Sequence, residues 1–183
     1  MKLNSYTEFK MCQAPLKDTS IDDSDNTGRG SAVFLSQITK NVVDFDRVKE
    51  NYTKKLSISC KNICSVDALF QNKDNYLFFV EFKNGEISPA QIKHKVRDTL
   101  LIFNSITEKQ IDFTRTNAKF ILVVNDERIE KQDSKKKKAM YMARKTTNND
   151  FADYGLENMR GYLFDKVDCL GASAFDKWVA TIL

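Results

Sequence analysis

The sequence predicts an α/β fold in which a mixed β-sheet, with an antiparallel hairpin and a strand-helix-strand unit, is flanked by helices. Three observations predict this class. Two runs of β-forming residues are joined by turn-forming ones, a strong helix start follows at Ser88-Pro89, and an unbroken apolar run comes later. A hairpin followed by a helix and another strand needs one sheet with both antiparallel and parallel neighbours.

The length of the chain fits one domain. It has 183 residues, and single domains commonly contain about 100 to 200. Residues 1–31 are polar and include an acidic, glycine-bearing stretch, so we expect an N-terminal arm with little regular structure. Residues 32–183 are then expected to form a single α/β domain.

The first half of this domain alternates between two kinds of pattern. Apolar residues within 32–54 recur at roughly helical spacing, which predicts one or two helices. Three short runs rich in β-formers then predict strands at residues 56–60, 63–70 and 76–83. Residues 71–75 favour turns, so the last two strands are expected to form an antiparallel hairpin.

The second half returns to helical spacing. Ser88 at the N-cap, Pro89 at the first helical position and Gln91 three residues after the cap form a capping box, so a helix should begin at Pro89. The continuous apolar character of residues 118–124 predicts a buried strand. Residues 161–170 have strand character, and residues 173–183 have the pattern of an amphipathic helix.

The sequence predicts no transmembrane helix. The longest apolar runs are far shorter than the roughly 20 residues that cross a bilayer, and the polar start lacks the apolar segment of a secretion signal. We therefore interpret the protein as cytoplasmic, with no membrane partner. Cys60 and Cys64 have a spacing compatible with zinc, but no second Cys or His pair follows, so reduced cysteines in or near the core are favoured.

The positive charge is concentrated in one segment. The formal net charge is +4, yet residues 131–145 contain seven Lys or Arg and one Asp. Such a cluster on a near-neutral body is expected of a protein that contacts a phosphate backbone. The candidate nucleic-acid-binding residues are Lys135, Lys136, Lys137 and Lys138, and the alternative is a run of lysines that is merely solvated.

The predicted hairpin carries the most informative residues, Asp67, Glu81 and Lys83. If a five-residue connection places Asp67 opposite Glu81, two carboxylates lie on one face with Cβ atoms about 5 Å apart. Lys83 then follows on the same face, two residues along. Like charges in direct opposition are destabilising, so this arrangement favours a divalent cation, Mg²⁺ or in its place Mn²⁺.

This residue set suits phosphodiester hydrolysis. Asp67 and Glu81 would bind the ion together with the backbone carbonyl of Phe82, and Lys83 would orient or help to deprotonate the attacking water. The competing interpretation is an exposed strand ion pair of little energetic value. The apolar residues around Glu81 argue against that, because buried strands rarely carry unpaired charges.

An acid before one strand, Glu-x-Lys in the next and a following amphipathic helix resemble the PD-(D/E)xK nuclease superfamily, which has the restriction-endonuclease-like fold. The resemblance covers roughly residues 42–124 and implies that Asp67 and Glu81 bind metal and that Lys83 is catalytic. It departs from the family pattern in having Val66 where proline is usual. A helical acid upstream is often a further ligand in this family, and Glu50 is our first candidate.

Three other positions complete the comparison with the family. Asp46 is the second candidate for the upstream acid. In the helix that follows the hairpin, members related to the RecB nuclease have Gln-x-x-x-Tyr, whereas here Gln91 is followed four residues later by Lys95. The sequence therefore departs from that subset. We expect Gln91 and Lys95 to contact nucleic acid.

We therefore expect a Mg²⁺-dependent (endo)nuclease, with DNA favoured over RNA as its substrate. The resemblance suggests restriction, phage defence, repair or mobile-element processing as its setting. Since one such site cuts one strand, duplex cleavage calls for a homodimer or a partner subunit. The alternatives are a non-catalytic nucleic-acid-binding protein, or a protein-interaction module whose carboxylates and lysine form a structural ion network.

Overall fold

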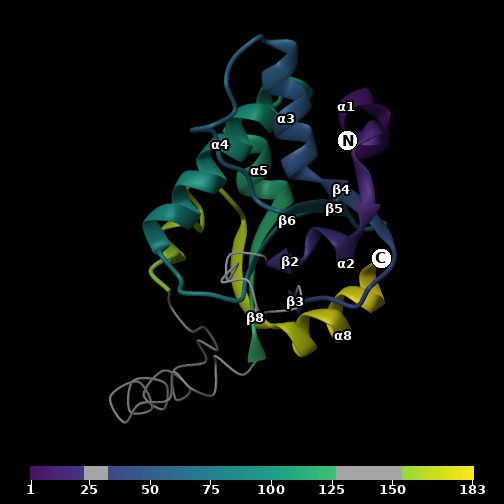
Figure 1. Cartoon of the computed structure of the whole chain (residues 1–183), viewed down its shortest axis with the longest axis vertical. Helices are drawn as coiled ribbons and strands as arrows, with labels where there is room; N and C mark the ends of the chain where they lie inside the picture. Colours follow the sequence, from purple (N-terminus) through teal and green to yellow (C-terminus); the bar gives the residue numbers. More distant parts are fainter. Residues whose placement is uncertain (23–32, 127–153) are drawn as a thin grey trace.

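The computed structural model describes residues 1–22, 33–126 and 154–183 (Figure 1). At its centre is a six-stranded sheet in the order β1-β4-β5-β6-β7-β8. The β5–β6 pair is antiparallel, whereas β6–β7 and β7–β8 are parallel, so the predicted mixed sheet is confirmed. The strands are β1 (Gln13–Pro15), β4 (Asn41–Asp44), β5 (Ala68–Gln71), β6 (Leu77–Lys83), β7 (Ala118–Val124) and β8 (Lys166–Gly171).

Helices cover both faces of the sheet (Figure 1). One face packs against η1 (Leu3–Ser5), α1 (Thr7–Met11), α3 (Phe45–Lys55), α4 (Pro89–Thr107), α5 (Ile111–Asn117) and η2 (Glu157–Met159). The other face packs against α2 (Leu16–Thr19) and α8 (Ala172–Ile182). A short ribbon of β2 (Ile21–Asp22) and β3 (Val33–Phe34) completes the described elements.

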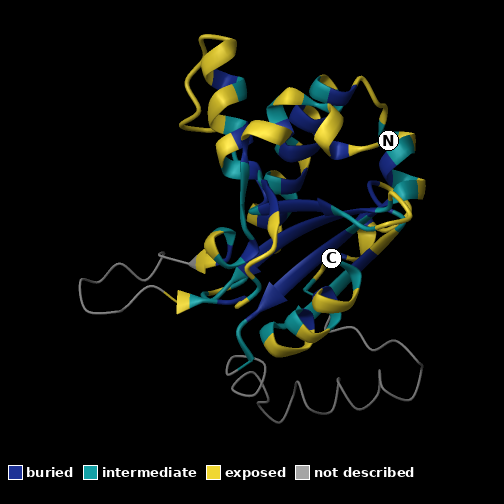
Figure 2. Cartoon of the chain, turned by 90° about the vertical axis from the view of Figure 1, so that its right-hand side faces the viewer, coloured by how far each residue is buried: buried dark blue, intermediate teal, exposed yellow. Residues whose placement is uncertain are grey.

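The central strand β6 supplies side chains to both layers. Phe79 belongs to the core under α4, while Phe78 and Phe82 belong to the core under α8. Successive strand residues point to opposite faces, and both faces of β6 are covered, so its run of apolar residues is unbroken. Figure 2 shows the sheet as a buried layer between helices whose outer surfaces are exposed.

Several local predictions are confirmed. Helix α4 begins at Pro89, and the Ser88 side chain accepts a hydrogen bond from the backbone N–H of Gln91 at 3.5 Å. The predicted strand at residues 118–124 coincides with β7. The C-terminal amphipathic helix is α8, which buries Phe175 and Val179.

The prediction that the N-terminal arm has little regular structure is wrong for residues 1–22. This part forms η1, α1, β1, α2 and β2, and β1 pairs with β4 at the edge of the main sheet. Phe9 and Leu16 have no exposed surface. Their contribution was missed because a few widely spaced apolar residues in a polar segment give no periodic pattern.

Residues 32–54 do not form only helices. Val42 and Val43 lie in β4, where one joins each core layer, and α3 begins at Phe45. A short strand buried on both faces has adjacent apolar residues, and these imitated a helical spacing in the sequence.

The strand predicted at residues 56–60 is absent, since these residues turn away after α3. Ser57 has a positive φ of 57°, and Leu56 and Ile58 are about half exposed. The strand predicted at 63–70 begins only at Ala68. The basic segment, residues 131–145, lies outside the described residues. Among those described, no helix is both long and apolar enough to cross a membrane.

Phe79 is a test of the core between β6 and α4. Its ring lies 5.3 Å from that of Phe103 and 5.4 Å from that of Phe164, measured between centroids. We expect Phe79→Ala to lower the free energy of unfolding by about 3 to 5 kcal/mol, because it leaves a cavity in a close-packed layer. Urea denaturation measures this change. Leu101→Ala, at a position 69% exposed on α4, is the control and should change stability by less than about 0.5 kcal/mol.

Candidate active site

The β5–β6 hairpin has the predicted register. Its ladder runs from Gln71 opposite Leu77 to Ala68 opposite Val80, with residues 72–76 as the connection. Asp67 lies one residue beyond the ladder, and its backbone N–H donates to the carbonyl of Val80 at 3.0 Å. The expected Asp67–Glu81 pair is therefore not part of the hydrogen-bonded ladder, but Asp67 and Glu81 are neighbours at the end of the ladder.

The carboxylates of Asp67 and Glu81 lie on the sheet face covered by α4, where the ammonium group of Lys95 contacts both of them. Lys95 Nζ is 2.7 Å from Glu81 Oε1 and 3.5 Å from Asp67 Oδ1. These two oxygens cannot be further apart than the sum of those distances. The structure thus brings Asp67 and Glu81 together on one side of the sheet.

Glu81 is the most deeply buried charged residue of the site. Its side chain has no exposed surface, and its Oε2 atom has no hydrogen-bond partner among the described residues. Asp67 retains 16% exposure, and its Oδ2 accepts a hydrogen bond from the backbone N–H of Phe82 at 2.6 Å. A buried acceptor without a partner is costly, which marks the Oε2 side of Glu81 as a place for a cation or a donor.

Burial changes the protonation behaviour of both acids. Loss of solvation, reinforced by the nearby charge of Glu81, raises the pKa of Asp67 well above its ordinary value. Loss of solvation also raises the pKa of Glu81, and the charges of Lys95 and Lys83 oppose that rise. The pair therefore favours binding a proton or another cation.

Lys95 is central to this site. The residue projects from α4 between the buried Ile92 and Val96, and its side chain is 25% exposed. Burial lowers the pKa of Lys95, but the charges of Asp67 and Glu81 outweigh it and hold the pKa above its usual range. In the structure Lys95 contacts the two acids, and the contact of Lys95 with nucleic acid stays a prediction. Its position beside Val96 on the sheet-facing stripe of α4 was the available signal.

Lys83 lies where the alternation of strand side chains predicts. Its Nζ is 3.3 Å from Glu81 Oε1, and its side chain is 21% exposed. Phe82 presents its N–H to Asp67 and its ring to the opposite core layer, where it packs on Phe175. The metal-ligand role expected for the Phe82 carbonyl stays a prediction.

The two candidates for the upstream acid occupy successive turns of α3. Asp46 is near enough for its charge to raise the pKa of both Asp67 and Lys95, and its Oδ1 accepts hydrogen bonds from Ser65 and Lys49. Glu50 is exposed, and its charge acts on Cys12 and Asp44 instead. The sequence ranked Glu50 before Asp46 as the upstream acid, whereas in the structure Asp46 is the acid beside the site.

The segment before Asp67 is held in place by α4. The backbone N–H of Cys64 donates to Asp98 and that of Val66 donates to the buried Thr99, both at 2.9 Å. Because Lys95 lies on the same helix, α4 positions both the ammonium group and the chain that carries Asp67.

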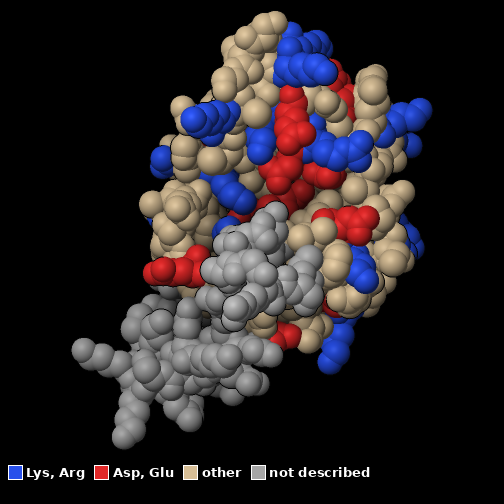
Figure 3. Space-filling view, viewed as in Figure 1, with Lys and Arg blue, Asp and Glu red and all other residues tan. Residues whose placement is uncertain are grey.

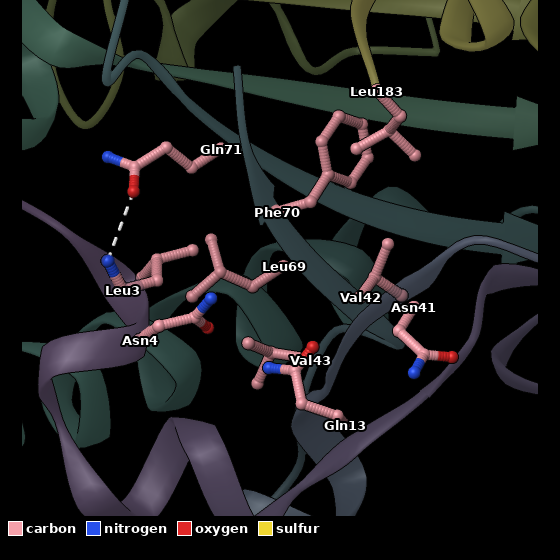
Figure 4. Close-up of a pocket in the computed structure, with 10 residues that line it drawn as sticks. All are labelled: Leu3, Asn4, Gln13, Asn41, Val42, Val43, Leu69, Phe70, Gln71 and Leu183. Carbon is pink, nitrogen blue, oxygen red and sulfur yellow. Dashed lines mark hydrogen bonds between the residues drawn. The ribbon is translucent and has the colours of Figure 1, made fainter. Parts of the chain in front are cut away.

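The remaining candidate positions have no contact with the carboxylates among the described interactions. Gln91 is exposed and serves the start of α4 through its backbone. Lys135, Lys136, Lys137 and Lys138 lie outside the described residues. A separate pocket of about 130 Å³ opens beside β4 and β5 (Figure 4). It is lined by Leu3, Asn4, Gln13, Asn41, Val42, Val43, Leu69, Phe70, Gln71 and Leu183, and none of these is a predicted site residue.

The donor chemistry of the acid pair suits a hard divalent cation. Carboxylate oxygens are the ligands that Mg²⁺ and Mn²⁺ prefer, and Glu81 Oε2 is a buried acceptor that lacks a partner within the described part of the chain. The described part of the chain contains no group of three or more His, Cys, Asp or Glu side chains arranged to hold a metal. An ion bound by the pair would thus take most of its ligands from water or substrate. Comparison of the chain with protein-family models, curated proteins and solved structures finds no match.

The raised pKa of Asp67 predicts a pH-dependent stability. In the folded state Asp67 keeps its proton at pH values where the unfolded chain has lost it, so folding takes up a proton and stability falls as the pH rises above about 4. Asp67→Asn removes this titration. We expect the variant to gain stability relative to wild type from about pH 4 upward, measured by urea denaturation with a chelator present.

The matched control is Asp74→Asn, in the exposed hairpin connection. This variant makes the same chemical change at a position away from the acid pair. A difference between Asp67→Asn and wild type that stays constant over the same range would contradict the raised pKa.

Proposed function

We propose that this protein is a Mg²⁺-dependent nuclease that hydrolyses phosphodiester bonds, in DNA rather than RNA. The observation that carries the proposal is the buried Asp67–Glu81 pair, flanked by two lysines, in which one Glu81 oxygen has no partner among the residues that the structure describes. The order hairpin, helix, parallel strand around this pair agrees with the resemblance to the PD-(D/E)xK superfamily, which we retain as part of the proposal.

Asp67 and Glu81 would hold the ion. When bound, Mg²⁺ lowers the pKa of a water ligand and neutralises charge on phosphate oxygens. Lys83 would orient the attacking water and stabilise the negative charge that develops on the phosphoryl oxygens. The hydrogen bond from the Phe82 N–H would fix the Asp67 carboxylate in its orientation.

The visible surface over the site carries side chains of both charges. Figure 3 shows acidic side chains in a stripe over the region of α3 and β6, with Lys and Arg on both sides of it. The basic sequence 131–145 follows β7, and the N–H of Asn125 donates to the carbonyl of Lys83 at 3.3 Å. We propose that Lys135 to Lys138 bind the nucleic-acid backbone, and that a homodimer or a partner subunit supplies the second cut in a duplex.

One observation favours a second candidate function. Lys95 already compensates the acid pair at 2.7 Å from Glu81, as it would in a structural ion network. A non-catalytic nucleic-acid-binding or protein-interaction module on the same fold would need no further cation. The two candidates differ in metal-dependent turnover.

A digestion assay separates these candidates. With plasmid and oligonucleotide substrates and Mg²⁺ or Mn²⁺, we expect cleavage by wild type and a loss of at least about a hundredfold in Asp67→Ala, Glu81→Gln and Lys83→Ala. A chelator should abolish the activity. Lys73→Ala, in the exposed hairpin connection, is the matched control and should cut as wild type does.

Circular dichroism compares the fold of each variant with that of wild type, so that a loss of cleavage is distinguished from a loss of folding. Absence of cleavage of any nucleic acid by wild type would reject the nuclease and leave the binding module. Full activity in Lys83→Ala would reject the role given to that residue.

The basic segment has a test of its own. Replacing Lys135 to Lys138 with Ala should weaken binding to all DNA sequences alike, because phosphate contacts carry no sequence information. The slope of log affinity against log salt should become shallower by up to about 0.9 for each lysine that contacts a phosphate. Fluorescence anisotropy measures both, and the control replaces Lys2, Lys10, Lys40 and Lys73. An unchanged slope would remove the segment from the interface.

A further inference from the structure

The ammonium group of Lys95 occupies the position that joins the two acids. It is 2.7 Å from Glu81 Oε1 and 3.5 Å from Asp67 Oδ1, whereas Lys83 contacts Glu81 alone at 3.3 Å. Among the described residues, Lys95 is thus the cation that contacts both acids. It contacts one oxygen of each acid, and Glu81 Oε2 has no partner in residues 1–22, 33–126 and 154–183.

We infer that Lys95 is an internal counter-cation that competes with a divalent metal ion for Asp67 and Glu81, so that the metal must displace it to bind. This inference rests on the proposed function and says how metal binding at the same site is regulated. A metal ion and an ammonium group repel each other, and Lys95 already occupies Glu81 Oε1 and Asp67 Oδ1. A metal ion that bridges the pair through these two oxygens must therefore displace Lys95.

The surroundings of Lys95 allow such a displacement. The side chain is 25% exposed, so a path to solvent exists, and its flexible four-carbon stem can move the charge while α4 stays in place. The unpartnered Glu81 oxygen means that Lys95 does not satisfy every acceptor of the pair. A divalent ion, with more charge and several ligand positions, compensates the pair more completely.

A metal titration without nucleic acid tests the competition. Isothermal titration calorimetry with Mn²⁺ compares wild type, Lys95→Met, which keeps most of the side-chain length without the charge, and Lys93→Met. Lys93 is on the same helix and forms no ion pair with either acid in the described part of the chain. We expect Lys95→Met to bind Mn²⁺ at least about tenfold more tightly than wild type and Lys93→Met to bind within about twofold of it.

A second measurement uses wild type alone, in case Lys95→Met does not fold. Amine acetylation read by mass spectrometry reports the accessibility of each lysine. We expect Lys95 to react slowly without metal and at least about threefold faster with saturating Mn²⁺, while Lys93 is unchanged.

The outcomes distinguish this inference from the proposed function. Equal or weaker Mn²⁺ binding by Lys95→Met, or an acetylation rate of Lys95 that Mn²⁺ does not change, overturns the competition while metal-dependent cleavage still stands. Absence of Mn²⁺ binding to every variant overturns the competition, and the digestion assay then decides separately on the nuclease.

Discussion

A carboxylate that has lost its water must be compensated by a cation, and the organisation of this site follows from that constraint. Glu81 lies in the middle of a sheet covered on both faces, with no exposed side-chain surface. Its charge is tolerated because Lys95 reaches it from α4 and Lys83 from the same strand. Removing a lysine from such a group leaves an uncompensated charge, which is far costlier than losing a surface ion pair.

Helix α4, which carries Lys95, also holds the acids in position. Through Asp98 and Thr99, α4 holds the backbone that leads to Asp67, and through Lys95 it contacts both acids. The apolar stripe of α4, with Ile92 and Val96, fixes the helix on the sheet. Core packing and site electrostatics therefore depend on one docking geometry.

Local signals in the sequence account for what could be predicted. The hairpin, the start of α4 at Pro89 and strand β7 follow from turn residues, a capping motif and a continuous apolar run, all of which act over a few residues. Strand alternation within β6 placed Glu81 and Lys83 together for the same reason. The proximity of Asp67 followed from the hairpin register.

What could not be predicted depends on how helices dock. Whether Asp46 or Glu50 faces the acids is decided by the rotation of α3 against the sheet, which no local pattern encodes. The contact of Lys95 with both acids likewise requires α4 in its final place. The N-terminal elements were missed because Phe9 and Leu16 find their partners in distant parts of the chain.

The sharing of one ammonium group by two acids also has a consequence for how this protein can change over generations. Replacing Lys95 alone leaves two acids in a poorly solvated place without the cation that they share. Divergent copies of this chain that lose Lys95 should therefore also have replaced Glu81 or Asp67. Replacement of Lys95 alone should be a rare intermediate that persists only where stability elsewhere is in excess.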